Sequence, residues 1–483
     1  MYYHQNHVHH MSKRILKFGR AIGALALSGA CSLAPHYEKP TVVVSTSFQG
    51  STAWVSAVPA DQEPRGEWWL GFNDAGLNRL EAQFRSDNQS LKAAYAGLES
   101  ARQQVKAVRS LLLPSISANV GASRSRTSQN SPSYNASRGP FSEDFTANAS
   151  TSYELDLFGR LSNSFQTAKA QASATEGDVR SLELSLRVQV AITYFSIHAL
   201  DGEGNQLNSQ LQITNKALAQ AQALYKGGAY SKSDLDAVLT QYATLKSQID
   251  ENQLRRSQLE HALAVLVGAD PSSFKEPVQS LTTPHDKVYR SQALPTTVLQ
   301  RRPDVAAAER RVRAANAGVG VARAAYLPVF NLGGQFGRES LSKSTWWNEP
   351  SLAWSGAVQG GVLLLDAGRR SATIKSAQSN FDAQVALYRQ TVLSAIADVE
   401  DQLTARAALS DEQVEAVRAL DAARSSAKIA AAKYSVGTVT AMDVARAEAQ
   451  LSAATMAALD TEVRFLAAEL NLIRAIGGTA SSP

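Results

Sequence analysis

The sequence predicts a mixed α/β fold built from two tandem structural repeats. Three observations lead to this fold class. Stretches of about ten residues alternate between polar and apolar side chains, as in β-strands with two unlike faces. Each pair of such stretches leads into a helical pattern of about 65 residues that is almost free of helix breakers. The whole arrangement then occurs a second time along the chain.

The duplication is visible in the spacing of glycines. Gly368 follows Gly159 by 368 − 159 = 209 positions, and Gly437 follows Gly228 by 437 − 228 = 209 positions. A fixed interval of this kind indicates internal duplication of a structural unit. We expect each copy to form a helix, a strand, a loop, a second strand, a long helix, a turn and a shorter helix.

Proline and glycine mark where helices and strands meet. Each proline ends a helical pattern and opens an alternating run, and each glycine relaxes the backbone where a strand passes into the long helix. We therefore assign the junctions between sheet and long helix to two equivalent sets of residues: Pro114, Gly159 and Arg160, and Pro328, Gly368 and Arg369.

The number of strands in one chain has a consequence for assembly. Ten residues suit a tilted strand that crosses a bilayer. Four strands cannot close a lipid-exposed barrel, and an open sheet edge in hydrocarbon is prohibitive because its backbone groups lack partners. Several chains must then share one barrel, and cyclic symmetry is the natural route. A soluble β-hairpin attached to coiled coils is the alternative that periodicity alone leaves open.

Composition excludes other classes. The chain has 483 residues and a net charge of +5, and after the N-terminal segment it contains no run of 18 apolar residues, which excludes a spanning helix. Lys and Arg are scattered among Asp and Glu without a basic block, so we expect no nucleic-acid partner. No catalytic constellation is present, so we expect neither enzyme activity nor a metal or other cofactor.

The first 30 residues are predicted to be a lipoprotein signal peptide. A basic region and a short apolar core precede Cys31, the only cysteine, which cannot form an internal disulfide. The stretch from Leu27 to Pro35 resembles a bacterial lipoprotein signal, which implies a diacylglycerol and an N-acyl chain on Cys31. Leu27 lies four residues before the cysteine instead of the usual three, so an ordinary signal peptide cut nearby is the alternative. Met1 and Met11 are both possible starts.

Four stretches resemble a known family, and together they are highly specific. They are residues 67–74, 155–160 (Leu155-Asp-Leu-Phe-Gly-Arg160), 299–309 and 319–328. They are similar to those of the TolC-like outer-membrane factors, in particular the lipoprotein branch of NodT- and OprM-type efflux channels. The resemblance extends from about residue 32 to 475.

The resemblance implies a homotrimer in the outer membrane of a Gram-negative bacterium. Each protomer would give four strands to a shared transmembrane β-barrel, and its helices would form a long periplasmic α-helical barrel. The protein would act as the exit duct of a tripartite efflux system, with a periplasmic adaptor, an inner-membrane efflux pump and outer-membrane lipid as partners. The competing hypothesis is a periplasmic coiled-coil lipoprotein of structural or adaptor type, without a pore. The transported substrate does not follow from the residues.

Within this scheme the chain divides into seven parts. The repeats contain strand pairs at 114–158 and 328–366, long helices at 160–227 and 369–436, and return helices at 231–267 and 440–476. The parts are the signal peptide (1–30), an N-terminal tether and equatorial segment (31–74), repeat 1 (75–268), an equatorial linker (269–295), repeat 2 (296–476) and a tail (477–483).

The turns that follow the long helices are the candidate functional site. In the family such turns form the periplasmic aperture and the tip that contacts the adaptor. The candidate residues are Tyr225, Gly228, Asp234, Tyr434, Gly437, Asp443 and Arg446. The glycines are equally explained as helix C-caps, and the aspartates as first-turn acids that interact with the helix dipole. Some OprM-type channels close the aperture with an Asp and an Arg one turn later, but Arg446 and Ala449 stand at those positions. Arg446 is expected to pair with Asp443 instead.

Overall fold

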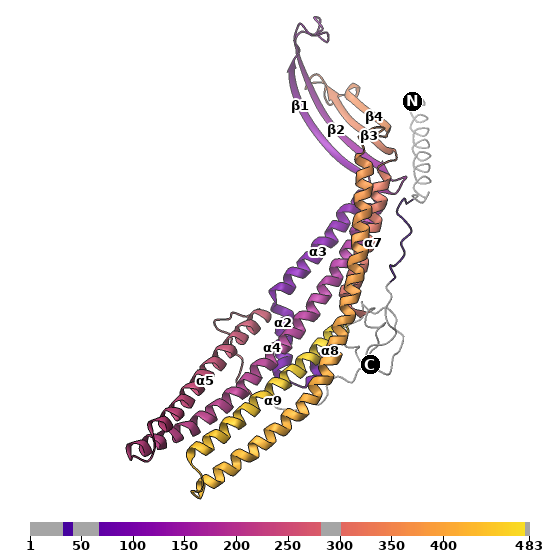
Figure 1. The fold of residues 1–483 in the computed structure, drawn as a ribbon. Coiled ribbons are helices and arrows are strands. Elements are labelled where there is room, and N and C mark those ends of the chain that lie inside the picture. The colour runs from indigo at the N-terminus through magenta and orange to yellow at the C-terminus, as the bar shows by residue number, and fades with distance from the viewer. Residues whose placement is uncertain (1–31, 42–66, 282–300, 479–483) are drawn as a thin grey trace. The chain divides into compact units, whose positions relative to one another are not determined.

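A computed structural model of the chain describes residues 32–41, 67–281 and 301–478. The predictions for the signal peptide and for acylation of Cys31, and part of the predicted linker, lie outside these residues. The elements are shown in Figure 1: η1 (Trp68–Phe72), α2 (Ala75–Asp87), α3 (Gln89–Ser110), β1 (Ser115–Arg126), β2 (Phe141–Leu155), α4 (Arg160–Lys226), α5 (Lys232–Leu266), α7 (Pro303–Ala324), β3 (Val329–Ser340), η2 (Glu349–Ser351), β4 (Leu352–Gly361), α8 (Arg369–Ser435) and α9 (Ala441–Ala475).

The chain forms two compact units. The first unit contains residues 1–40, 99–173 and 309–387. The second unit contains residues 41–98, 174–308 and 388–483. We call them the sheet unit and the helical unit. The long helices α4 and α8 contribute residues to both.

The sheet unit holds four antiparallel strands in the order β1-β2-β3-β4. Their register places Ala118, Ala149, Phe336 and Trp354 in one row across the sheet. An adjacent row, on the opposite face, is polar throughout and consists of Ser117, Ser150, Gln335 and Ser355. In the described residues β1 and β4 each pair on one side only, as the four-strand prediction requires.

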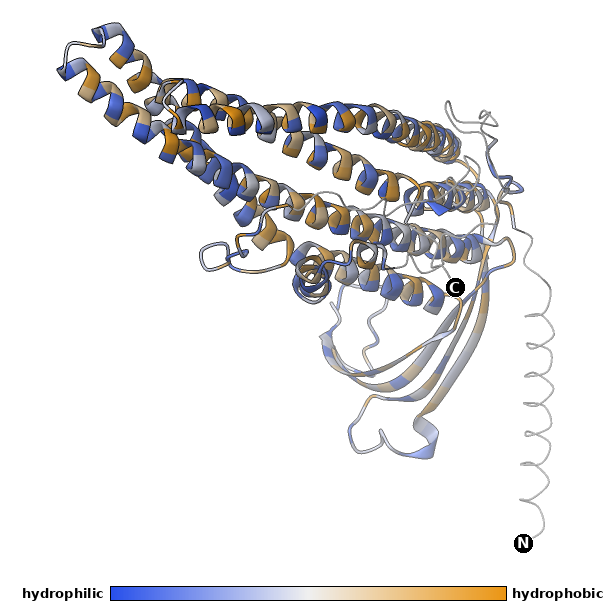
Figure 2. Ribbon diagram, turned by 90° about the horizontal axis from the view of Figure 1, so that it is seen from below, coloured by the Kyte–Doolittle hydropathy of each residue, from blue (hydrophilic) through white to orange (hydrophobic). Residues whose placement is uncertain are grey.

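The long helices and the return helices have the same lengths in the two repeats. Helices α4 and α8 each contain 67 residues, and α5 and α9 each contain 35. Hydrophobic and hydrophilic residues are interspersed along every long helix (Figure 2), so none of these helices is apolar on all sides. None of the described helices is both long enough and apolar enough to cross a membrane.

The core of the helical unit joins segments that are far apart in the sequence. Fully buried side chains of α2 (Leu77, Leu80 and Phe84) pack with Tyr194 and Phe195 of α4. Residues of η1, α3, α5 and α9 complete the same cluster. Burying a side chain of this size stabilises the fold by about 1.5–3 kcal/mol.

Two details of helix continuity differ from the sequence pattern. The single helix expected before the first strand of repeat 1 is divided, because Asn88 separates α2 from α3: its Oδ1 accepts a hydrogen bond from the backbone of Leu91, and its Nδ2 donates to the carbonyl of Leu266. The glycines in residues 201–204 suggest a kink or an interruption of the long helix, and the structure excludes the interruption, since α4 continues through them. A Cβ on Gly202 would lie 3.1 Å from Leu459 Cδ1, and one on Gly204 would lie 3.0 Å from Asn252 Oδ1. These glycines therefore allow close packing within a continuous helix.

Candidate functional site

The turn between α4 and α5 is a tight, fully hydrogen-bonded connection. Gly228 adopts a positive φ of 76°, and the backbone nitrogen of Ala229 donates to the carbonyl of Leu224 at 2.8 Å. Ser231 then caps α5: its hydroxyl accepts from the backbone nitrogen of Asp234 at 3.2 Å, and the Asp234 carboxylate accepts from the backbone and hydroxyl of Ser231 at 2.9 and 2.7 Å. The turn thus satisfies both helix ends from local residues.

The turn between α8 and α9 repeats this geometry. Gly437 has a φ of 75°, and the backbone nitrogen of Thr438 donates to the carbonyl of Lys433 at 3.0 Å. Thr440 and Asp443 form the second capping box. The Thr440 hydroxyl accepts from the backbone nitrogen of Asp443 at 3.3 Å, and the Asp443 carboxylate accepts from the backbone nitrogen and the hydroxyl of Thr440 at 2.9 and 2.7 Å. The duplication inferred from the sequence is therefore preserved at the level of individual hydrogen bonds.

Capping favours the ionised form of both aspartates. Side-chain and backbone hydrogen bonds from Ser231 lower the pKa of Asp234, and those from Thr440 lower the pKa of Asp443. Both carboxylates are ionised at neutral pH. Arg446 lies near Asp443, with Nη1 3.8 Å from Oδ1, and the pair is exposed. An exposed pair at this distance contributes little stability, so Arg446 is available to a partner.

The two hairpins that carry these turns enclose a groove of about 410 Å³. Small residues of α4, Ala217 and Ala221, pack against Ala441 and Ala445 of α9 and allow the helices to approach closely. Gln220 of α4 donates a hydrogen bond to the hydroxyl of Tyr434 at the end of α8. The groove is lined mainly by apolar side chains, with Leu224, Tyr230 and Met442 among them.

Exposed apolar side chains surround the groove. Val436 is 73% exposed, and Tyr225, Leu224 and Tyr434 are each about 40% exposed, with values of 41%, 39% and 38%. The structure places all seven predicted residues at or beside the two turns. Tyr225, Gly228, Tyr434 and Gly437 lie at the ends of α4 and α8 or in the turns themselves. Asp234 lies at the start of α5, and Asp443 and Arg446 lie at the start of α9.

The junctions of sheet and helix are only partly equivalent. Gly159 and Gly368 have positive φ angles of 73° and 88°, and β1 and β3 begin directly after Pro114 and Pro328. Arg160 forms a bidentate pair with Glu154, at 2.9 and 2.6 Å.

In repeat 2 the corresponding ion pair uses a different residue. Asp366 accepts from Arg370 Nε at 2.6 Å, whereas the side chain of Arg369 is exposed. The equivalence of Arg369 with Arg160 therefore does not extend to the ion pair. Asp366 also accepts from the backbone nitrogen of Arg370, as Asp156 accepts from that of Leu161 in repeat 1, so Asp366 corresponds to Asp156 and not to Glu154.

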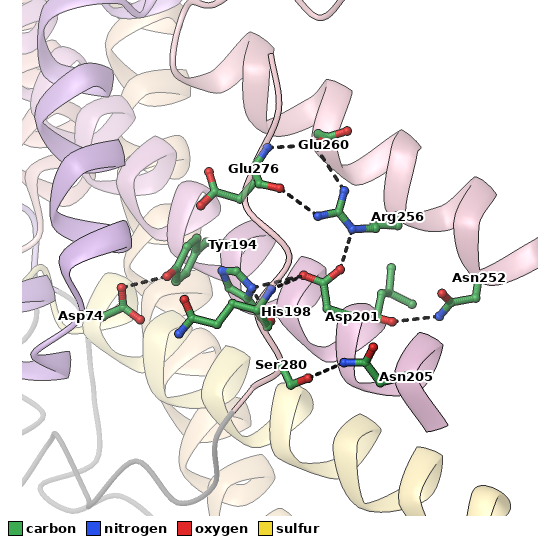
Figure 3. A network of polar contacts seen from close by, with 12 residues as sticks. Asp74, Tyr194, His198, Asp201, Asn205, Asn252, Arg256, Glu260, Glu276 and Ser280 are labelled. Atoms are coloured by element: carbon green, nitrogen blue, oxygen red, sulfur yellow. Dashed lines mark hydrogen bonds and ion pairs between the residues drawn. The ribbon is translucent and has the colours of Figure 1, made fainter. Parts of the chain in front are cut away.

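A buried polar network in the helical unit was not predicted from the sequence (Figure 3). Arg256 of α5 contacts Asp201 of α4 at 2.5 Å and Glu260 at 3.2 Å, and it donates to the carbonyl of Glu276 at 2.9 Å. Asp201 also accepts from the backbone nitrogen of Gln279 at 3.0 Å. Burial raises the pKa of Asp201, but hydrogen bonds from His198, Arg256 and Gln279 outweigh it and lower the pKa overall.

This network attaches the segment after α5 to α4. The Nδ1 atom of His198 lies 2.6 Å from the carbonyl oxygen of Gln279 and 3.4 Å from Asp201 Oδ2. Nearby, the Tyr194 hydroxyl donates to Asp74 at 2.8 Å (Figure 3). His261 of α5 is exposed. The network has a structural role, because each of its carboxylates interacts with cationic side chains or accepts hydrogen bonds from backbone N–H groups.

Comparison with known proteins agrees with this architecture. The family model described as "Outer membrane efflux protein" matches residues 81–269 and 294–478. The outer membrane protein OprJ of Pseudomonas aeruginosa is 30% identical over 407 residues, which cover 83% of each chain. The outer-membrane channel OprN is 26% identical with a TM-score of 0.81, over 93% of this chain and 99% of its own. The open-state channel MtrE of Neisseria gonorrhoeae is 26% identical with a TM-score of 0.75, over 93% and 98%.

These findings define the protein as an outer-membrane channel of an efflux system, and the predicted fold class is confirmed. The chain belongs to the outer membrane efflux protein family. This is a family of transport proteins, and its members act at the outer membrane. The four-stranded sheet and the family membership together favour the channel over a coiled-coil lipoprotein without a pore.

Proposed function

We propose that the chain works as a homotrimeric exit duct that receives substrate from an inner-membrane pump through a periplasmic adaptor. Three copies would supply twelve strands to one closed barrel, which gives each unpaired edge of β1 and β4 a neighbour. A lipid anchor on Cys31 would hold the N-terminus of each protomer at the membrane. The mass of the purified oligomer, measured by light scattering, tests the trimer; a stable monomer or dimer would contradict it.

The observation that carries the adaptor proposal is the groove between the two hairpins. Its lining is mainly apolar, Tyr225 and Val436 are exposed at the two turns that flank it, and Arg446 in the first turns of α9 has only a weak internal partner. A helical hairpin of a partner could bury these apolar side chains and meet the charge of Arg446.

Photocrosslinking in cells tests this surface. A photoreactive amino acid at Val436 should give a crosslink to the periplasmic adaptor, identified by mass spectrometry. The same substitution at Val265, which is 63% exposed near the end of α5, is the matched control and should give none. Equal adaptor yields from both positions, or none from Val436 in a strain that assembles the pump, would contradict the proposal.

Similarity does not select the substrate. Relatives that are each 28% identical are named for toluene (TtgC of Pseudomonas putida), antibiotics (ArpC of Pseudomonas putida) and cations (CusC of Escherichia coli). We infer that the pump selects and the duct conducts, because relatives of equal similarity are named for chemically unlike substrates.

A further inference from the structure

A polar cleft of about 320 Å³ lies in the sheet unit, between the first turns of α4 and the middle of α7. Its floor consists of buried residues: Asn163, Ala170, Asn316 and Ala317. Its rim carries three cationic side chains, Lys169, Arg310 and Arg313. None of the described residues that line the cleft is acidic. A small pocket with this lining favours an anionic ligand.

The floor contains a hydrogen-bond donor without a partner. Asn163 is 4% exposed, and its Oδ1 accepts from the Ser32 hydroxyl at 3.0 Å. Its Nδ2 is buried and has no hydrogen-bond partner in the described structure. An unsatisfied buried donor is unfavourable, so a ligand oxygen that accepts from it would gain affinity.

The cations on the rim are held in different ways. Arg313 is oriented by Glu309, at 3.1 Å, and by the ring of Tyr37, with its guanidinium 4.9 Å from the centroid. Arg310 donates to the carbonyl of Ser173 at 3.2 Å. Lys169 is exposed and forms no ion pair with any described residue. Its ammonium group is therefore free to turn toward a ligand in the cleft.

The N-terminal segment places the cleft next to the predicted lipid anchor. Asn316 Nδ2 donates to the carbonyl of Pro35 at 2.9 Å, and Arg323 donates to that of Leu33 at 3.4 Å. Together with the bond from Ser32 to Asn163, these contacts fix the first residues of the segment along the cleft. Cys31 directly precedes Ser32 in the sequence. If Cys31 carries the acyl chains of the proposed function, lipid headgroups reach this end of the cleft.

We propose that this cleft binds a phosphate group, carried by the headgroup of an anionic phospholipid or present as free phosphate in the periplasm. Asn163 Nδ2 donates to one phosphate oxygen, and Lys169 and Arg313 neutralise the charge. With a lipid bound, the site fixes the height and rotation of each protomer in the membrane, in addition to the anchor on Cys31.

Lipid retention by the acylated, full-length oligomer tests the site. The protein is released from nanodiscs that contain equal amounts of phosphatidylglycerol and a galactosyl diacylglycerol, which has no phosphate, and native mass spectrometry counts the bound lipids. Wild-type protein should retain up to one phosphatidylglycerol per chain. Lys169→Gln should weaken retention about tenfold, because it removes one charge-assisted hydrogen bond. Asn163→Asp keeps the acceptor for Ser32 but replaces the donor with an anionic oxygen, and should abolish retention.

The matched control is Lys106→Gln, an equal charge change on an exposed lysine of α3 in the same unit. It should retain lipid like the wild type. Displacement by inorganic phosphate, combined with no preference between the two lipids, would support the phosphate site and overturn the lipid source. Equal loss in Lys169→Gln and Lys106→Gln, or binding of neither phosphatidylglycerol nor phosphate, would overturn the proposal. Channel conductance of the same wild-type sample is recorded separately, so that failure of the duct and failure of this site are distinguishable.

Discussion

Arg256 Nε lies 2.5 Å from Oδ1 of Asp201, and this ion pair ties α5 to α4 in the helical unit. The Asp201 side chain is 2% exposed, so the two helices meet around an almost completely desolvated charge. The same guanidinium contacts Glu260, whose side chain is also 2% exposed. The stability of this part of the fold therefore depends strongly on one cation.

Arg256→Ala should destabilise the protein by about 3 kcal/mol or more, because it leaves the buried Asp201 carboxylate without its arginine partner, whereas Glu260 keeps its ion pair with Lys275. Arg255→Ala is the matched control: the neighbouring arginine pairs only with exposed Glu251, so its loss should change stability by less than about 1 kcal/mol. Denaturant unfolding in detergent measures both variants. Similar midpoints for the two would show that the buried network contributes little.

Ser231→Ala should destabilise the start of α5 by about 1 kcal/mol, because the hydroxyl that caps the helix is lost. Hydrogen exchange of the amides in the first turn of α5, measured by mass spectrometry, should quicken accordingly. Ser233→Ala is the matched control, because Ser233 lies in the same turn and its side chain forms no hydrogen bond with the described residues. This variant should leave hydrogen exchange unchanged or make it slower. Faster exchange in both variants would contradict a specific capping role.

Gly228→Ala should destabilise the first hairpin turn by about 1–2 kcal/mol. No atom lies within 4 Å of the added Cβ, so the cost arises only from the positive φ of 76°. Gly97→Ala is the control, since this helical glycine also has open space around it and the change should stabilise α3 by about 0.5–1 kcal/mol. Opposite signs of the two effects in thermal unfolding are expected, and a neutral Gly228→Ala would contradict the assigned turn geometry.

Stability should fall between pH 5 and pH 8 because of Glu81. Burial raises the pKa of this carboxyl from 4.5 to about 7, and Arg187 opposes the rise only in part. A raised pKa in the folded state stabilises the protein fully below pH 4.5, and this contribution is lost as the pH rises through 7. Glu81→Gln does not titrate and should flatten this dependence in denaturant unfolding, whereas the exposed-residue variant Glu99→Gln should not. An unchanged slope in Glu81→Gln would refute the assignment.

The sequence was most informative where structure depends on local or repeated patterns. Pro114 and Gly159 signalled changes of secondary structure through their own backbone restrictions, and the second copy allowed each signal to be checked. Ser231 and Asp234 stand three positions apart at a helix start, a spacing that follows from helix geometry. The pair of Asp443 and Arg446 is likewise a local relationship.

Contacts between distant segments were beyond such reasoning. Asp201 and Arg256 are 55 residues apart, and His198 and Gln279 are 81 apart, so nothing in either neighbourhood indicates the partner. For the same reason Gly202 was interpreted as a helix interruption, although Leu459 occupies the space that a Cβ would need. Asn88 combines a cap with a distant carbonyl contact, and only the cap has a local signature.

Single-channel recording in planar bilayers tests the central claim, that this chain forms an outer-membrane conduit. The purified oligomer, shown by mass to be intact, should give stepwise conductance after insertion. An intact oligomer that inserts into the bilayer and gives no conductance would contradict the account.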